Sequence, residues 1–374
     1  MGNSYQTLSD AVTLVASDKT WIESESIRQL HFAASLDGMQ NVAGMPDLHP
    51  GITYPVGAAF FSFKRIYPAL IGGDIGCGMA FARTSLDGVR PQAEPMDRKL
   101  GDLDQPPERF SDMPFDIPGW ALSEPTLGTI GGGNHFAEFQ KVDAIYDEAA
   151  AEQLEVDKRH LFLLVHTGSR GMGHAVYERH VQAFSHAGLD EDCPAFADYL
   201  FEHDRAVAFA QFNRAVVIER ILQRLKARGT PVLDVTHNAI ARETVDGMSG
   251  WMHRKGANSS HCAYSIVPGS RGDFTYLVQP VADARSLFSI AHGAGRKWAR
   301  KECRGRLEKR FTLKQMARSK IGSHVICNDT RLVFEEAPEA YKPVESVIAD
   351  MACAGVIRLV ARFRPVLTYK TRRK

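Results

Sequence analysis

The chain has 374 residues, of which 44% are hydrophobic and 24% charged, and its formal net charge is +1 at pH 7. This composition is typical of a soluble globular protein, and the small net charge means that any nucleic-acid-binding surface must be local. With no signal peptide, no apolar stretch of membrane-spanning length and six scattered cysteines without a CxxC pair, we expect a cytoplasmic protein without disulfides, a membrane anchor or a zinc ribbon.

The first third of the chain is predicted to contain one helix and two strands separated by a loop. We expect a helix over 23–36, a loop over 42–51, where proline and glycine interrupt the pattern, and strands over 57–63 and 69–71. Residues 87–125 are rich in Pro, Asp and Glu and show no apolar periodicity. They are therefore predicted to form an irregular surface excursion outside the core.

The second part of the chain has clearer patterns. The continuous apolar run 161–165 predicts a buried strand, and apolar residues at helical spacing predict a helix over 203–228 that Gly229 would cap. Short β-like runs over 231–236 and 286–291 each end at a histidine. We predict one α+β domain spanning residues 1–374, in which mixed sheets carry the ligand loops at one rim and helices pack outside.

A glycine-rich loop over 70–79 carries one carboxylate and one thiol, Asp74 and Cys77. Glycine allows the backbone to approach a ligand closely, and Asp and Cys are both metal ligands. Four further histidines adjoin glycine-rich or polar turns at the ends of apolar segments: His135, His166, His237 and His292. This donor set suffices for a binuclear centre bridged by a thiolate, and two-metal centres suit phosphoryl chemistry.

Other histidines lack this setting, and we interpret them as structural or surface residues: His160, His180, His186, His203 and His324.

The chain contains neither a P-loop nor a Lys-x-Asp-Gly motif, so a nucleotide would not be carried by that lysine. Imidazole is a competent nucleophile toward phosphorus, and His292 is the best candidate because the glycines after it leave room for a nucleotide. Arg296 would supply a cation for phosphate, and the loop over 268–272 offers backbone amides and the Ser270 hydroxyl to a second anionic or purine-like group.

A basic segment over 296–320 contains eleven Lys or Arg residues against Glu302 and Glu308. Considered alone, such a run is a solvated helical face. Beside a catalytic site it is equally a surface for a polyanion. Both interpretations remain open at this point.

Eight motifs occur in an order that resembles the RtcB family of RNA ligases. They are Met45-Pro-Asp-Leu-His-Pro-Gly, Gly73-Asp-Ile-Gly-Cys-Gly, Gly131-Gly-Gly-Asn-His-Phe-Ala-Glu, His166-Thr-Gly-Ser-Arg-Gly-Met-Gly-His, His237-Asn, His253-Arg-Lys-Gly-Ala, Pro268-Gly-Ser-Arg-Gly and His292-Gly-Ala-Gly-Arg. Each motif is weak alone, but the ordered set is specific and covers residues 42–300.

The resemblance implies a GTP- and manganese-dependent ligase that joins an RNA 3′-phosphate or 2′,3′-cyclic phosphate end to a 5′-hydroxyl end, in RNA repair or tRNA splicing. His292 would accept GMP. Two Mn²⁺ ions would be held, with the thiolate bridging, by Asp74, Cys77, His135, His166 and His237.

The resemblance also implies the residues that contact nucleotide and RNA. GMP or GTP would be contacted by Asn134, Glu138, His237, Asn238, Pro268, Gly269, Ser270, Thr275, His292, Gly293, Ala294, Gly295 and Lys370. RNA would be contacted by Arg170, Arg254, Lys255, Arg296, Lys297 and Arg300.

The length of the chain and its basic C-terminal end resemble the compact bacterial paralogues, for which broken tRNA or ribosomal RNA ends are the implied substrates. An activating protein or a release-factor homologue is a further candidate partner. One alternative is a binuclear phosphoesterase that uses the same ligands without a covalent nucleotide and needs no GTP. A second is an RNA-binding protein whose chemistry has lapsed, although His292 and an intact ligand set oppose it.

Overall fold

Two large β-sheets carry most of the core in the computed structural model, which describes residues 4–373. The first sheet has the strand order β1 (Gln6–Ser9), β2 (Val12–Leu14), β3 (Met39–His49), β4 (Val56–Ser62), β12 (Met248–Lys255) and β11 (Asn238–Val245). The second has the order β10 (Gly229–Thr236), β6 (Gly78–Asp87), β8 (His160–Thr167), β7 (Phe136–Ile145), β18 (Ile357–Thr371), β15 (Thr275–Pro280) and β14 (Ser265–Pro268), with β17 (His324–Cys327) also paired to β18. Two pairs, β2–β3 and β17–β18, are parallel among antiparallel neighbours, which confirms the predicted mixed sheets.

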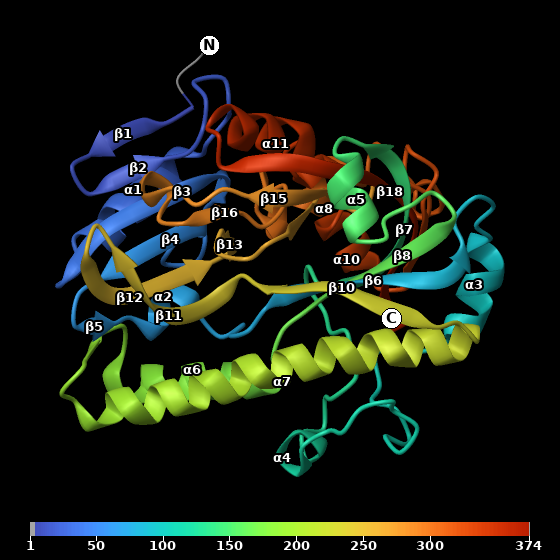
Figure 1. Ribbon diagram of the computed structural model, residues 1–374, viewed down its shortest axis with the longest axis horizontal. Helices are drawn as coiled ribbons and strands as arrows, with labels where there is room; N and C mark the ends of the chain where they lie inside the picture. The colour runs from blue at the N-terminus through green and yellow to red at the C-terminus, as the bar shows by residue number, and fades with distance from the viewer. Residues whose placement is uncertain (1–3, 374) are drawn as a thin grey trace.

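Helices pack on the outside of the sheets, as predicted. The longest, α7 (Pro194–Leu225), runs along the lower side of the molecule next to α6 (Gly171–Phe184) (Figure 1). The others are α1 (Ser24–Ala34), α2 (Pro68–Ile71), α3 (Ala93–Leu100), α4 (Gly119–Leu122), α5 (Glu148–Gln153), α8 (Arg300–Leu307), α9 (Leu313–Met316), α10 (Thr330–Glu335) and α11 (Val344–Cys353), with 3-10 turns η1 (Ala284–Ser286) and η2 (Pro338–Ala340).

The remaining strands form two antiparallel two-stranded ribbons. In one, β13 (Ala257–Ser259) pairs with β16 (Ser289–Ala291), and in the other, β5 (Arg65–Ile66) pairs with β9 (Leu189–Asp190). No helix in the described part of the chain is both long and apolar enough to cross a membrane.

The apolar stripe of α7 holds this helix on the second sheet. Val217 and Ile221 lie in one buried cluster with Leu163 and Val165 of β8 and Leu367 of β18. Burial of each aliphatic side chain contributes about 1.5–3 kcal/mol, so these contacts are a main source of stability. The helix predicted from this spacing is confirmed, and it begins earlier than predicted.

Arg214 on the same helix joins three segments that carry candidate ligands. Its side chain is fully buried, and its guanidinium donates to both carboxylate oxygens of Asp234 on β10, at 2.8 and 2.6 Å. It also donates to the carbonyls of Gly76 in the loop before β6 (2.9 Å) and Thr167 at the end of β8 (3.0 Å). One buried cation therefore fixes the relative positions of β10, β8 and the Asp74–Cys77 loop.

Two predictions for the N-terminal third are wrong. The loop expected over 42–51 is the buried strand β3, which tolerates Pro46 because pairing with β4 is interrupted between Gly44 and His49. The strand expected over 69–71 is the short helix α2, because Pro68 at its first turn presets a helical backbone angle. The predictions for α1 and β4 are confirmed within two residues.

Three further predictions are corrected. Gly229 does not cap α7, since Lys226 closes the helix in the left-handed region (φ 55°) and Gly229 begins β10. The run over 286–291 contains the end of a 3-10 turn before the short strand β16. The excursion over 87–125 contributes to the core after all, because α3 buries Met96 and Leu100 against α7 and the second sheet.

The role of Arg214 predicts a large loss of stability in Arg214→Ala. Two backbone carbonyls lose a buried donor, at about 1–3 kcal/mol each, whereas the Asp234 carboxylate is 31% exposed and keeps contact with water. The free energy of unfolding in urea should fall by the sum of these two losses. Arg179→Ala is the matched control, because Arg179 is exposed and pairs with Glu202 at the surface, so it should cost less than about 1 kcal/mol. Equal losses in the two variants would contradict this role.

Candidate metal centre and nucleotide pocket

Strand topology brings the candidate ligands to one rim of the second sheet. Strands β10, β6, β8 and β7 are consecutive antiparallel neighbours, so the ends of β10 and β8 lie beside the starts of β6 and β7. His237 follows β10, Cys77 precedes β6, His166 lies at the end of β8, and His135 precedes β7. The predicted arrangement of ligand loops at a sheet rim is thus present.

Five donor atoms form a compact chain with Cys77 at its middle. Its Sγ lies 3.4 Å from His135 Nε2 and 3.3 Å from His166 Nε2. His166 Nε2 lies 3.2 Å from His237 Nε2, while His135 Nε2 lies 3.1 Å from the Asp74 carboxylate. Ligand atoms that share one ion at bond lengths of about 2.0–2.3 Å are roughly 2.8–3.8 Å apart, the shorter values in octahedral and the longer in tetrahedral geometry. The spacing therefore fits ligands of a metal, and Cys77, His135 and His166 form a group that could hold one.

The protonation states of these groups favour a cation. Burial, followed by repulsion from neighbouring histidines, lowers the pKa of His166 and His237 well below the usual value, so both imidazoles are neutral with lone pairs available. Burial, followed by the nearby Asp74, raises the pKa of the Cys77 thiol well above its usual value. A metal ion would compensate the buried thiolate, so its binding would release this proton.

The Asp74 carboxylate packs directly against the backbone at Gly168, so a side chain at position 168 is excluded. A Cβ at Gly168 would lie 2.2 Å from Asp74 Oδ1, so only glycine fits at this position after β8.

His292 belongs to the same site but receives its partner from the first sheet. Its Nδ1 donates to Asp47 Oδ2 at 2.7 Å, and Asp47 is completely buried. This bond selects the tautomer whose lone pair is on Nε2, the atom that a nucleophile needs. The rings of His292 and His237 are 4.7 Å apart between centroids, so the candidate nucleophile adjoins the metal ligands.

A β-bulge and a glycine allow Asp47 to meet His292. Asp47 lies in the part of β3 where pairing with β4 is interrupted, and such bulges redirect side chains near active sites. Lys342 stabilises the bulge by donating to the carbonyls of Pro46 (2.9 Å) and Leu48 (2.8 Å). Gly295 has φ +70°, and a Cβ there would collide with the Asp47 carbonyl. The loop after His292 can therefore pack directly on β3.

A cavity of about 1020 Å³ opens beside His292 and contains most of the predicted nucleotide contacts. Its lining includes Asn134, Glu138, His237, Asn238, Pro268, Gly269, Ser270, Gly293, Ala294, Gly295 and Lys370, together with Asp74, Cys77 and His166. This volume accommodates a nucleotide-sized ligand. Thr275 is not in this lining; it is buried behind Gln140, whose amide donates to it at 2.7 Å.

Two buried ionisable groups lie deep in the cavity. Burial raises the pKa of Glu138 to about 7, against the opposing effect of hydrogen bonds from Thr368 and Gln140. Burial lowers the pKa of Lys370 to about 8, although Glu336, 3.8 Å away, favours its charged form. Lys370 also donates to the carbonyl of Gly133 at 2.8 Å, which places it next to the Asn134–His135 segment.

The predicted RNA contacts separate into two groups. Lys255, Arg296, Lys297 and Arg300 line the cavity. Arg170 lies 3.3 Å from His135 Nδ1 and outside this lining, and Arg254 is buried in a two-point ion pair with Glu243 at 2.5 and 2.9 Å. Arg254 is therefore engaged in an internal contact rather than presented to a ligand.

Four residues that support the site were not predicted from the sequence, namely Asp47, Arg214, Lys342 and Glu336. Asp47 stood in a quoted motif without an assigned role, and a carboxylate between apolar residues that prove buried was the available signal. Glu336 is buried among Arg296 (3.2 Å), Arg300 (3.5 Å) and Lys370. Nothing in the local pattern around Lys342 or Glu336 indicated these distant partners.

Comparison with known proteins agrees with this geometry. A sequence model of the family described as tRNA-splicing ligase RtcB matches residues 29–104 and 121–371, and the gap falls within the excursion that was predicted to be irregular. The chain is 50% identical over 373 residues to RNA-splicing ligase RtcB2 of Escherichia coli, covering 99% of this chain and 98% of that protein.

More distant relatives match over similar spans. The chain is 27% identical to tRNA-splicing ligase RtcB of Nanoarchaeum equitans, covering 96% of this chain and 95% of that protein. It is 26% identical to RNA-splicing ligase RtcB1 of Escherichia coli, covering 93% and 95%. With its ordered motifs, its rim of metal-type donors and these matches, the chain belongs to the RtcB family of RNA-splicing ligases.

Proposed function

We propose that this ligase joins RNA 3′-phosphate or 2′,3′-cyclic phosphate ends to 5′-hydroxyl ends through a covalent GMP on His292, with GTP as the nucleotide and Mn²⁺ as the metal. The observation that carries the proposal is the Asp47–His292 hydrogen bond of 2.7 Å, because it leaves the Nε2 lone pair free beside the metal-type donors and the cavity.

In the first step, His292 Nε2 attacks the α-phosphorus of GTP, a P–N bond forms, and pyrophosphate leaves. Asp47 accepts the hydrogen bond from Nδ1 throughout and stabilises the positive charge that develops on the ring. Glu138, Ser270 and Lys370 line the cavity and would contact the bound nucleotide.

In the second step, an RNA 3′-phosphate oxygen attacks the phosphorus of the adduct, and the P–N bond breaks. In the third, the 5′-hydroxyl oxygen attacks the RNA phosphate, GMP leaves, and the phosphodiester forms. A cyclic end would first be opened by water to a 3′-phosphate. Lys255, Arg296 and Arg300 line the route and would neutralise RNA phosphates.

Asp74, Cys77, His135, His166 and His237 would hold two Mn²⁺ ions, which supply charge neutralisation at the reacting phosphates when bound. Cys77 lies between His135 and His166, so its thiolate would hold a metal together with both imidazoles. High identity to RtcB2 supports a compact bacterial type of enzyme, for which broken tRNA or ribosomal RNA is the proposed substrate.

Incubation with α-labelled GTP and Mn²⁺, followed by denaturation, tests the covalent step. Wild-type protein should retain an acid-labile, base-stable label, and His292→Ala should retain none. Asp47→Asn should be labelled about 10²–10⁴-fold more slowly, because it holds the wrong tautomer. His160→Ala is the matched control, since His160 pairs only with Asp157 away from the cavity. No label on metal-containing wild-type protein would reject the mechanism and favour the phosphoesterase alternative.

Thermal unfolding with added Mn²⁺ tests the metal centre. A metal that binds only the folded state stabilises it by about 2.7 kcal/mol at a free concentration 100-fold above Kd. Cys77→Ala should lose this stabilisation. Cys303→Ala should keep it, because Cys303 is an equally buried thiol outside the donor cluster. Equal stabilisation of both variants would place the metal elsewhere.

The lowered pKa of Lys370 predicts pH-dependent nucleotide affinity. Lys370 is charged below its pKa of about 8 and loses its proton above it, so the attraction for phosphate disappears as pH rises. Binding of a non-hydrolysable GTP analogue should be about tenfold weaker at pH 9 than at pH 7. Lys370→Arg should show a much flatter profile, since arginine stays charged. Titration of the nucleotide itself is common to both proteins, so identical profiles would exclude Lys370 as the cause.

A further inference from the structure

The mouth of the nucleotide cavity is bounded by two surfaces of different chemistry. One, here called the apolar lip, consists of Trp21 and Ile52. The other, the basic lip, consists of Lys297, Trp298, Lys301 and Arg306. The chain has four tryptophans, and two of them line this one cavity.

The apolar lip is exposed yet held in place. Ile52 is fully exposed (102%), and Trp21 is 52% exposed. The residue before Ile52 is fixed to α1, because Gln29 donates to the Gly51 carbonyl at 3.0 Å and accepts from the Gly51 amide at 3.1 Å. Apolar side chains held in solvent at the entrance of a cavity indicate a binding surface.

In the basic lip, Trp298 is partly buried against the apolar cluster that contains Leu307, and two cations lie over its ring. Lys297 Nζ lies 5.4 Å and Arg306 Cζ 5.1 Å from the centre of the Trp298 ring. Arg306 also pairs with Glu302 at 3.0 Å, whereas Lys297 and Lys301 have no ion-pair partner among the described residues. A base can therefore take the place of the flexible Lys297 over the ring while the ammonium moves to a phosphate.

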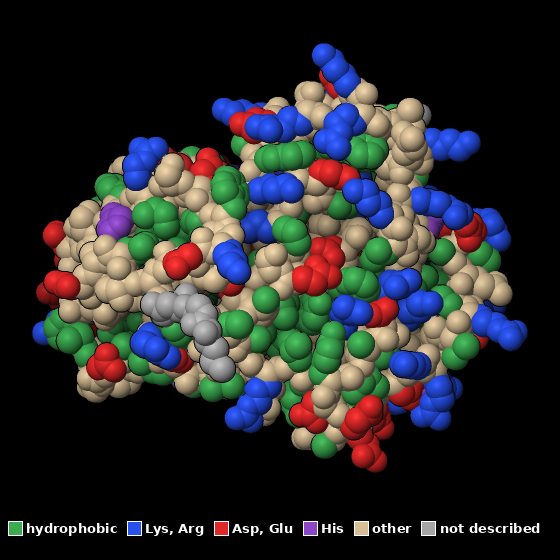
Figure 2. Space-filling view, turned by 90° about the horizontal axis from the view of Figure 1, so that it is seen from above, with side chains coloured by type: hydrophobic (Ala, Val, Ile, Leu, Met, Phe, Trp, Pro, Cys, Tyr) green, Lys and Arg blue, Asp and Glu red, His purple; other side chains and the backbone are tan. Residues whose placement is uncertain are grey.

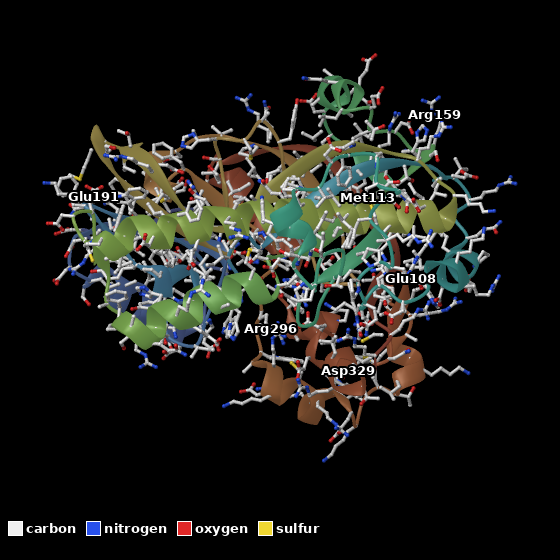
Figure 3. The ribbon with its side chains drawn as sticks, turned by 90° about the horizontal axis from the view of Figure 1, so that it is seen from below. Glu108, Met113, Arg159, Glu191, Arg296 and Asp329 are labelled. Atoms are coloured by element: carbon white, nitrogen blue, oxygen red, sulfur yellow. The ribbon has the colours of Figure 1, made fainter. Side chains whose placement is uncertain are left out.

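The basic lip begins a part of the chain that projects from the sheets. In Figure 3, Arg296 marks the start of this projection and Asp329 lies within it. Lys and Arg side chains are frequent on the projection at the top of Figure 2. The charge of this lip thus suits a polyanion better than an apolar protein partner.

We propose that the two lips clamp the unpaired terminal nucleotide of an RNA end, with its base stacked on Trp298 and bordered by Ile52. This inference rests on the proposed function and names its substrate class, RNA ends whose last base is unpaired. Proteins that bind single-stranded nucleic acid combine aromatic platforms with cations in this way. The terminal base of a duplex has one face stacked on its neighbour and its edge paired with the other strand, so it cannot enter between the lips without unpairing.

The test measures binding of RNA that cannot react, carrying hydroxyls at both ends, to the manganese-loaded protein by fluorescence anisotropy. Trp298→Ala should weaken binding of single-stranded RNA about tenfold, the order expected for loss of one stacking contact. Ile52→Ala should weaken it in the same direction. Trp120→Ala is the matched control, since Trp120 also lies beside an arginine (Arg205, 5.1 Å) but outside the cavity, and should have no effect.

A second comparison identifies the base as the group that is bound. Wild-type protein should bind RNA with an abasic site at its 3′- or 5′-terminal nucleotide about tenfold more weakly, and Trp298→Ala should add no further loss on the same RNA. A blunt duplex end should bind weakly and be insensitive to Trp298→Ala.

The proposal would be overturned if Trp298→Ala bound RNA as tightly as wild type, or if it lost equal affinity for base-bearing and abasic RNA. The two lips would then be a surface for a protein partner instead. Failure of the proposed function is distinguishable, because it appears as absent labelling of His292 by GTP. That assay contains no RNA, and thermal unfolding of each variant shows separately that the variant is folded.

Discussion

The candidate metal centre depends on one buried cation. Arg214 contacts Asp234 on β10, the carbonyl of Thr167 on β8 and the carbonyl of Gly76 in the loop that carries Cys77. The two carbonyls receive a buried donor, while the Asp234 carboxylate that pairs with the guanidinium is 31% exposed. Because α7 is itself fixed to the sheet by apolar packing, the guanidinium transmits the rigidity of the sheet and helix to the donor atoms. Ligands placed within a few tenths of an ångström need this kind of support.

A second constraint joins the first sheet to His292, the proposed nucleophile. His292 follows the ribbon strand β16, while its partner Asp47 comes from the bulge in β3. Lys342 holds the bulge through two carbonyls, and Gly295 lets the two segments touch. The reactive tautomer is therefore a property of tertiary packing, and residues 245 positions apart in the chain define it.

The cavity combines neutral donors at one end with cations at the other. The buried imidazoles of His166 and His237 provide lone pairs, whereas Glu336 holds Arg296 and Arg300 in positions where phosphates would enter. Metal-type donors, His292 and the basic lip thus line one and the same cavity.

The sequence by itself determined the family, the chemistry-bearing residue types and the regular elements with strong periodicity. The apolar spacing of α7 and the continuous run of β8 depend on local pattern, so both were predictable. The candidate site was predictable because its residues lie in local sequence motifs, those around Asp74, Cys77, His135, His166, His237 and His292.

Only the tertiary structure decided which residues support those groups. Pro46 suggested a loop, yet residues 42–49 belong to a buried strand. Pro46 lacks an amide N–H, and it is tolerated there because pairing with β4 is interrupted at this bulge. Arg254 looked available for RNA, but Glu243 on the neighbouring strand engages it. Asp47, Arg214, Lys342 and Glu336 act through partners far away in the chain. Such contacts follow from packing between elements, and no local sequence pattern encodes them.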